Sequence, residues 1–277
     1  LVEIGDRVRE ELDYVREAGH ARLYSEALAD CPLVRVPKVH DDLSTRRLLT
    51  LGWLDGKKLL TYKDADLDIR NRLGEAMFMA WWLPFSRYGV IHGDPHLGNY
   101  TVFEQDGQPA GINLLDYGCV RIFPPRFVGA VVDLYEGLKT DDRERVVHAY
   151  ETWGFRNLSA PMIDALNIWA RFIYGPILDD RVRTVADGIA PGEYGRKEAF
   201  RVRAELKRLG GVTIPREFVF MDRAAIGLGA VFLHLRAERN FYRLFNQVLE
   251  GFSVETVRDR QAGALRRAGL ATIPPAT

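Results

Sequence analysis

The sequence predicts an α+β fold in which a small mixed portion is followed by a larger, mostly helical portion. Short β-prone runs are confined to residues 34–115, whereas nearly every stretch after Pro125 carries apolar residues at helical spacing. A loop rich in His, Asp and Asn lies near the junction of the two portions, where ligand sites are common. The 277 residues, 47% of them hydrophobic, are enough to bury a sizeable core.

The first element is an amphipathic helix expected over Glu3–Ala29. Asp30-Cys31-Pro32 ends it, and two β-prone runs follow at Val34–Val39 and Leu48–Trp53, separated by a polar turn. A second long helix is expected from Leu67 to about Tyr88. Pro84 is expected to end or kink that helix, and its large apolar residues are expected in the core, namely Met77, Met79, Trp81 and Trp82.

The middle of the chain changes character. β-prone runs are expected at Val90-Ile91, Tyr100–Phe103 and Gly111–Leu115, with the polar loop after the first of them. From Pro125 onward we expect helices, with breaks at Gly154, Pro176, Ala190–Gly195, Gly210-Gly211-Pro215 and Gly251.

Composition excludes some classes of function. Lys and Arg together number 38, as do Asp and Glu, so nothing indicates a nucleic-acid binder that works through bulk charge. Cys31 and Cys119 form no disulfide framework, which is typical of a reducing, cytoplasmic setting. Apolar stretches such as Ala224–Leu235 are too short to span a bilayer. The chain opens at Leu1 on a helical pattern already in progress, which we interpret as a fragment or processed product.

The densest polar cluster is the segment from His92 to Asn99. Asp94 and Asn99 lie five residues apart on a loop that leaves a β-prone run, and Asp116 follows another such run. Phosphoryl transfer from ATP needs one carboxylate that orients or deprotonates the attacking hydroxyl, and oxygen ligands for magnesium. The spacing matches the kinase catalytic loop with Asp94 in the first role, and it makes Asn99 and Asp116 the metal ligands.

A rival interpretation is metal-dependent hydrolysis. His92, Asp94 and His96 alternate, so on an extended strand they would face one way and could hold zinc or iron. Pro95 and Gly98 favour a loop instead, in which His92 braces the backbone. Asp94 and Asp116 could also be ordinary turn or capping carboxylates, and the role of His96 stays open.

These residues resemble the UbiB-type atypical kinases, also called the AarF or ADCK group. The family loop reads His-x-Asp-Pro-His-Pro-Gly-Asn, and here Leu97 replaces the second proline. The family Asp-Phe-Gly stands as Asp116-Tyr117-Gly118. In the opening helix, Glu11 and Asp13 resemble the family's Glu-x-Asp signature, and Glu17 stands where the family places the glutamate of helix C.

The resemblance implies a protein-kinase-like fold with ATP and magnesium as cofactors. Residues 1–55 would be a truncated amino lobe, with helix C, two or more strands and the hinge, and residues 56–277 a large helical carboxyl lobe. Glu11, Asp13 and Glu17 would lie at the nucleotide, and the hinge backbone would hold the adenine through Gly52, Trp53 and Leu54. The strand lysine that pairs with Glu17 and the phosphate-covering loop cannot be placed in the chain, so we expect the polypeptide as given to be inactive.

The implied activity of the parent protein is ATP hydrolysis or phosphotransfer linked to isoprenoid-quinone or lipid metabolism. The acceptor would be a small molecule or lipid, and the setting cytoplasmic, with peripheral contact to the inner membrane compatible with this role. One alternative is a small-molecule kinase of the aminoglycoside or choline type, which a screen of hydroxylated substrates would reveal. Another is a nucleotide-binding pseudokinase scaffold, in which nucleotide binds without turnover.

Overall fold

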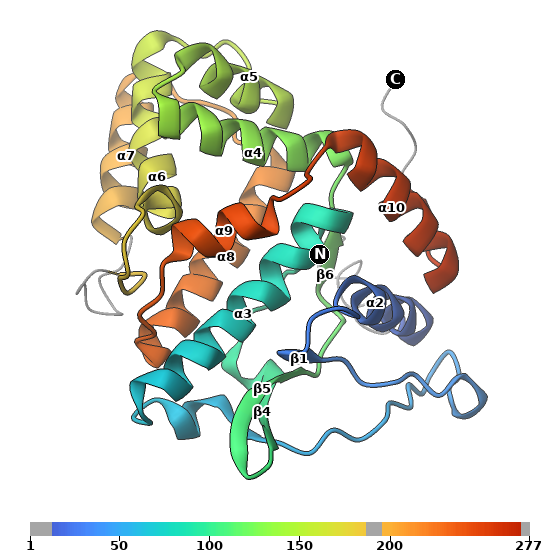
Figure 1. Ribbon diagram of the computed structural model, residues 1–277. Helices are drawn as coiled ribbons and strands as arrows, with labels where there is room; N and C mark the ends of the chain where they lie inside the picture. Colours follow the sequence, from blue (N-terminus) through green and yellow to red (C-terminus); the bar gives the residue numbers. More distant parts are fainter. Residues whose placement is uncertain (1–12, 187–195, 273–277) are drawn as a thin grey trace.

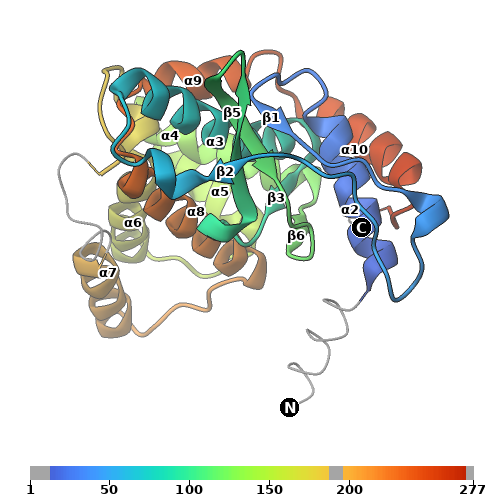
Figure 2. The ribbon, with the colours of Figure 1, turned by 90° about the horizontal axis from the view of Figure 1, so that it is seen from below.

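The computed structural model describes residues 13–186 and 196–272, and its mixed helices and sheets confirm the α+β class. Figure 2 shows the strands between α2 and α10 on one side and helices α3, α6 and α8 on the other. The β4–β5 hairpin projects from this centre, whereas α4 to α7 form a helical group at the far end of the molecule (Figure 1).

Helix α2 (Tyr14–Ala27) accounts for the described part of the expected opening helix, and the Asp13 side chain caps it by accepting a hydrogen bond from the Arg16 N–H. Strand β1 (Val34–Arg35) and a 3₁₀ turn (Asp41–Leu43) follow. The strand expected over Leu48–Trp53 is wrong. This segment makes only isolated bridges within its own neighbourhood, because it turns back on residues 38–45 and reaches no sheet.

Two small sheets occupy the middle of the described chain. The first has the order β1-β5-β4-β2 and is built from β1, β2 (Lys57–Lys58), β4 (Tyr100–Gln105) and β5 (Gln108–Leu114). Asp106 and Gly107 both have positive φ angles, as a two-residue type I′ hairpin turn requires. The second sheet pairs β3 (Val90–His92) with β6 (Val120–Ile122). Strands β3, β4 and β5 were expected, whereas the short β2 and β6 were not.

Helix α3 (Leu67–Tyr88) has the expected bounds, but it continues through Pro84. The missing N–H of a proline costs a helical hydrogen bond. Burial of Met77, Trp81 and Phe85 on this helix offsets that cost.

Seven further helices are described after residue 124. They are α4 (Pro125–Thr140), α5 (Arg143–Trp153), α6 (Ala160–Leu178), α7 (Arg196–Arg208), α8 (Arg216–Leu235), α9 (Phe241–Val248) and α10 (Val254–Ala268). The breaks at Gly154, Gly210–Pro215 and Gly251 are confirmed, and the one expected at Ala190–Gly195 lies outside the described residues. Pro176 lies inside α6 and ends nothing, whereas Asp141 and Arg236 break the chain with left-handed backbones.

Helix α8 corrects the expectation that the apolar stretches are too short to span a bilayer. Its 20 residues, with a mean hydropathy of 1.6 in the most apolar window, would suffice by length and composition. Core helices meet the same criterion, and one face of α8 packs in the interior through Met221, Ala224, Leu228, Val231, Phe232 and Leu235. This helix is therefore weak evidence for a membrane span.

Candidate functional site

Two strand pairs hold the polar loop 93–99 against the loop 115–119. In the first pair His92 lies opposite Val120, and the Gly93 N–H then donates to the Cys119 carbonyl at 2.9 Å. In the second pair Tyr100 lies opposite Leu114, and the Leu115 N–H donates to the Asn99 carbonyl at 3.0 Å. The loops are thus joined at both ends and lie face to face.

Gly93 permits the close approach at one of these ends. A Cβ atom at this position would lie 2.5 Å from the Cys119 carbonyl oxygen, which is backbone and cannot move aside. Any other residue would therefore push the two loops apart.

Asp94 and Asn99 come into direct contact across the first loop. The Asn99 side-chain N–H₂ donates to the Asp94 carbonyl at 3.0 Å and to its carboxylate at 3.3 Å. These bonds use the amide nitrogen, so the amide oxygen of Asn99 remains available as a ligand. Asp94 itself is exposed, at the surface of the loop.

Asp116 lies at the start of the second loop, where one carboxylate oxygen accepts the Gly118 N–H at 2.8 Å. Two buried rings lie close to both carboxylates. Burial, then the charges of Asp94 and Asp116, raise the pKa of the Tyr100 phenol, and the same two charges oppose the lowering of the pKa of His92 by burial. The structure therefore places Asp94, Asn99 and Asp116 in one region.

His92 is 2% exposed, and its Nε2 donates to the Asp116 carbonyl at 2.6 Å. His96 accepts the Gly98 N–H through Nδ1 at 3.1 Å. One nitrogen of each ring is therefore engaged within the protein, and buried His92 and exposed His96 lie in different environments, which argues against the metal-hydrolysis interpretation. Moreover, residues 13–186 and 196–272 contain no cluster of three His, Cys, Asp or Glu side chains able to hold a metal.

His20 was missed by sequence reasoning. It is 3% exposed on α2, and its Nδ1 donates to the Tyr117 carbonyl at 3.0 Å, while burial lowers its pKa to about 4. Two buried imidazoles therefore hold the consecutive carbonyls of Asp116 and Tyr117. Its spacing from Glu17 could have indicated this position. His20 lies three residues after Glu17 and so on the same face of the helix.

Glu17 also faces this loop. Its pKa is raised, first by burial and then by the charge of Asp116, whereas a hydrogen bond from the Tyr117 backbone opposes this rise. The structure thus brings Glu17 to Asp116, and no ion pair joins it to any residue in the part of the chain that the structure describes. Asp13 acts as the helix cap noted above, and Glu11 lies outside the described residues.

The segment expected to form the hinge is hydrogen-bonded to the β4–β5 hairpin through Asn113 and Asp55. The Gly52 N–H donates to the Lys38 carbonyl at 2.7 Å, so only the carbonyl of Gly52 remains free to contact a ligand. Trp53 is 87% exposed and donates to Asp55, and Leu54 is half-buried. Asn113, another residue missed from sequence, is fully buried and donates to the Asp55 carbonyl at 3.0 Å, three residues before Asp116.

Comparison with known proteins supplies a family match and several relatives. Residues 1–150 match the ABC1 atypical kinase-like domain. The chain is 28% identical over 190 residues to the chloroplastic protein Activity of bc1 complex kinase 1 of Arabidopsis thaliana, covering 66% of this chain and 27% of that protein. It is 30% identical over 137 residues to the mitochondrial atypical kinase COQ8B of Rattus norvegicus, covering 50% and 25%. It therefore spans about a quarter of the length of either relative.

A solved structure shares the fold. The Mycobacterium tuberculosis protein Rv3197, determined in complex with erythromycin, superposes with a TM-score of 0.62 over 89% of this chain and 60% of the other, at 21% sequence identity. At this identity the likeness concerns the fold alone.

Proposed function

The chain belongs to the ABC1 atypical kinase-like family, and we propose that it binds ATP with magnesium between the loops 93–99 and 115–119. In the complete protein this site would support ATP hydrolysis or phosphotransfer. The observation that carries the proposal is the double strand pairing, β3 with β6 and β4 with β5, which brings the two loops together.

The donor set at these loops fits magnesium. Asp116 and the amide oxygen of Asn99 are hard oxygen ligands, and magnesium takes few protein ligands because it retains several waters. Bound magnesium would neutralise phosphate charge. Asp94, held by the Asn99 amide and exposed at the loop surface, would orient or deprotonate the attacking hydroxyl.

His92 and His20 would keep the Asp116 loop in place through their hydrogen bonds to its backbone. Glu17 would pair with a lysine that cannot be placed in residues 1–277, and such a cation would offset the repulsion that Asp116 exerts on it. The adenine would contact the Gly52 carbonyl and the backbone of Trp53 and Leu54, and Glu11 and Asp13 would contribute to nucleotide binding, as the family resemblance implies.

We further propose the division into residues 1–55, an amino lobe with helix C and hinge, and residues 56–277, a helical carboxyl lobe. The acceptor would be an isoprenoid quinone precursor, lipid or other small molecule, met in the cytoplasm or at the surface of the inner membrane. The family resemblance carries this part of the proposal.

Binding of a fluorescent ATP analogue tests the site without requiring turnover. We expect binding to the wild-type chain to need magnesium, and Asp116→Asn to weaken the magnesium-dependent part at least tenfold because it removes a charged ligand. Asp106→Asn is the matched control, since it removes the same charge from the turn at the opposite end of the β4–β5 hairpin. The proposal would be contradicted if both variants lost the same amount of nucleotide affinity, or if the wild-type chain bound the analogue without magnesium.

In a protein that also supplies the lysine and phosphate-covering loop, Asp94→Asn should preserve nucleotide binding and reduce phosphate release about 10²–10⁴-fold. Unchanged phosphate release in this variant would instead support the pseudokinase scaffold.

A further inference from the structure

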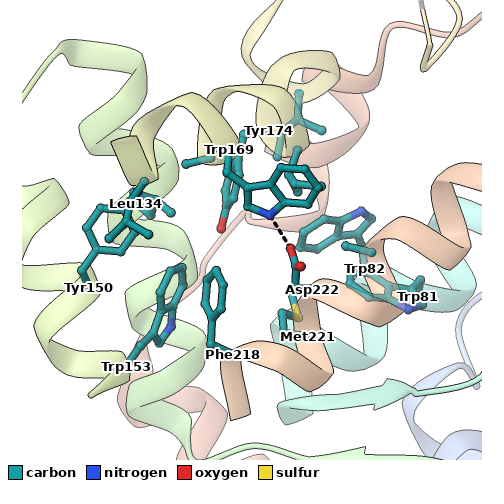
Figure 3. A pocket seen from close by; sticks show the side chains of 15 residues that line it. Trp81, Trp82, Leu134, Tyr150, Trp153, Trp169, Tyr174, Phe218, Met221 and Asp222 are labelled. Carbon is teal, nitrogen blue, oxygen red and sulfur yellow. Dashed lines mark hydrogen bonds between the residues drawn. The ribbon is translucent and has the colours of Figure 1, made fainter. Parts of the chain in front are cut away.

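An apolar cavity lies among the helices of the carboxyl-terminal portion, away from the loops described above. Its volume is about 60 Å³, several times what one water needs. Seven aromatic side chains from α3, α5, α6 and α8 line it, namely Trp81, Trp82, Tyr150, Trp153, Trp169, Tyr174 and Phe218 (Figure 3). Trp82, Trp169 and Phe218 are only half-buried, so the cavity reaches the surface.

One acidic side chain enters this apolar wall. Asp222 of α8 accepts a hydrogen bond from the Trp169 indole N–H at 2.5 Å through one oxygen, and no residue in the described ranges donates to the other. Figure 3 shows Asp222 between Trp169 and Trp82. Asp222 is half-buried among these apolar side chains, and this burial raises the pKa of its carboxyl.

A second apolar pocket of about 70 Å³ adjoins the cavity. The two share Trp81, Trp82, Ile173, Ile177 and Ala225, and the second is also lined by Phe232 of α8 and Phe241 of α9. Asp222 lines only the first pocket, and the side chains that line the second are apolar. Water in such a space makes few hydrogen bonds, so an apolar occupant displaces it at little cost.

We propose that this cavity binds an amphiphilic amine, a molecule with an ammonium head and a linear apolar tail. The head would lie between Asp222 and the faces of Trp82 and Trp169, because a cation is attracted both by a carboxylate and by aromatic rings. The tail would lie along α8 toward Phe232. A neutral head brings no positive charge to the carboxylate, and an anionic head is repelled by it, so charge selects the ligand.

Three probes of one length test this proposal on the whole chain at pH 7: n-octylamine, 1-octanol and octanoate. Four of the five tryptophans line the cavity, so intrinsic fluorescence reports binding. We expect saturable binding of octylamine at a concentration at least tenfold lower than that of 1-octanol, and weaker binding still of octanoate. Equal affinity for amine and alcohol, or no saturable binding of the amine, would overturn the proposal.

Two variants separate charge from shape. Asp222→Asn should bring octylamine to the affinity of 1-octanol, whereas Ala225→Leu, which fills the space shared by the two pockets, should weaken binding of both probes. Thermal unfolding of each variant checks that it is folded. A preference for the amine that survives in a folded Asp222→Asn variant would assign the selectivity to the aromatic rings alone and overturn the role of Asp222.

Discussion

Two buried histidines show how single residues position the candidate site. His92 and His20 come from different parts of the chain, yet each donates to a carbonyl of the loop that carries Asp116. A neutral imidazole can donate from one nitrogen without bringing charge into the interior, so it suits a buried position between a helix and a loop.

The burial of His20 predicts a pH dependence of stability. Its pKa is lowered to about 4, whereas an exposed histidine titrates near 6.5, so between these values the unfolded chain binds more protons than the folded chain. The stabilisation is therefore fully present above pH 6.5 and is lost as the pH falls toward 4. The shift corresponds to about 3 kcal/mol.

His20→Asn should retain a donor for the Tyr117 carbonyl and remove this titration. Urea unfolding at pH 7.5 and pH 4.5 measures the effect, and we expect the difference in unfolding free energy between the two conditions to be smaller in the variant by about 2–3 kcal/mol. His148→Asn, which removes an exposed imidazole from α5, controls for the change of residue type. The same difference in wild type and His20→Asn would show that His20 is not the titrating group.

At the scale of elements, α8 connects the apolar cavity to the polar loop. Met221, Asp222 and Ala225 line the cavity, and Gly227 lies so close to the loop that a Cβ atom would come within 2.5 Å of Pro95. Pro95 directly follows Asp94. The position of one helix therefore affects both features of the molecule.

Two helical glycines provide a matched test of this contact. Gly175→Ala in α6 is the control, because no neighbouring element lies within 4 Å of the new methyl group. The helix preference of alanine is offset by contact of the methyl group with the Pro176 ring that follows, so we expect the unfolding free energy to change by less than about 1 kcal/mol. Gly227→Ala should lower it by about 1–3 kcal/mol, because the rigid Pro95 ring must move, and it should weaken magnesium-dependent nucleotide binding. A Gly227→Ala variant as stable and as competent in binding as Gly175→Ala would show that α8 and the loop are not coupled.

At the scale of the whole molecule, one hydrophobic core extends from α2 to α10. Its buried residues run from Ala21 to Ala268, and β1, within the first 55 residues, pairs in parallel with β5. Arg267 of α10 also forms an ion pair with Glu26 of α2. These contacts cross the boundary that we propose between the two lobes.

This continuity predicts cooperative unfolding. Amides of α2 and α10 should show the same unfolding free energy in hydrogen exchange measured by mass spectrometry over a urea series, because neither helix can leave the shared core alone. Loss of protection in α2 at clearly lower urea than in α10 would indicate that the first 55 residues fold as a separate unit.

The sequence by itself determined the features that depend on near neighbours. Helical spacing predicted α3 to its ends, and the hairpin strands β4 and β5 follow from β-prone runs around a Gly107 turn. Spacing and family resemblance predicted the loops that carry Asp94, Asn99 and Asp116, and the family match agrees with that resemblance.

Only the tertiary structure decided which distant segments meet. Two- and three-residue strands such as β2 and β6 carry almost no periodic signal, because their hydrogen-bond partners lie far along the chain. Pro84 continues a helix because packing outweighs its missing N–H, and the contact of His20 with Tyr117 joins residues 97 apart. The apolar cavity is also decided by the tertiary structure, because four helices must pack together before Asp222 lies among tryptophans.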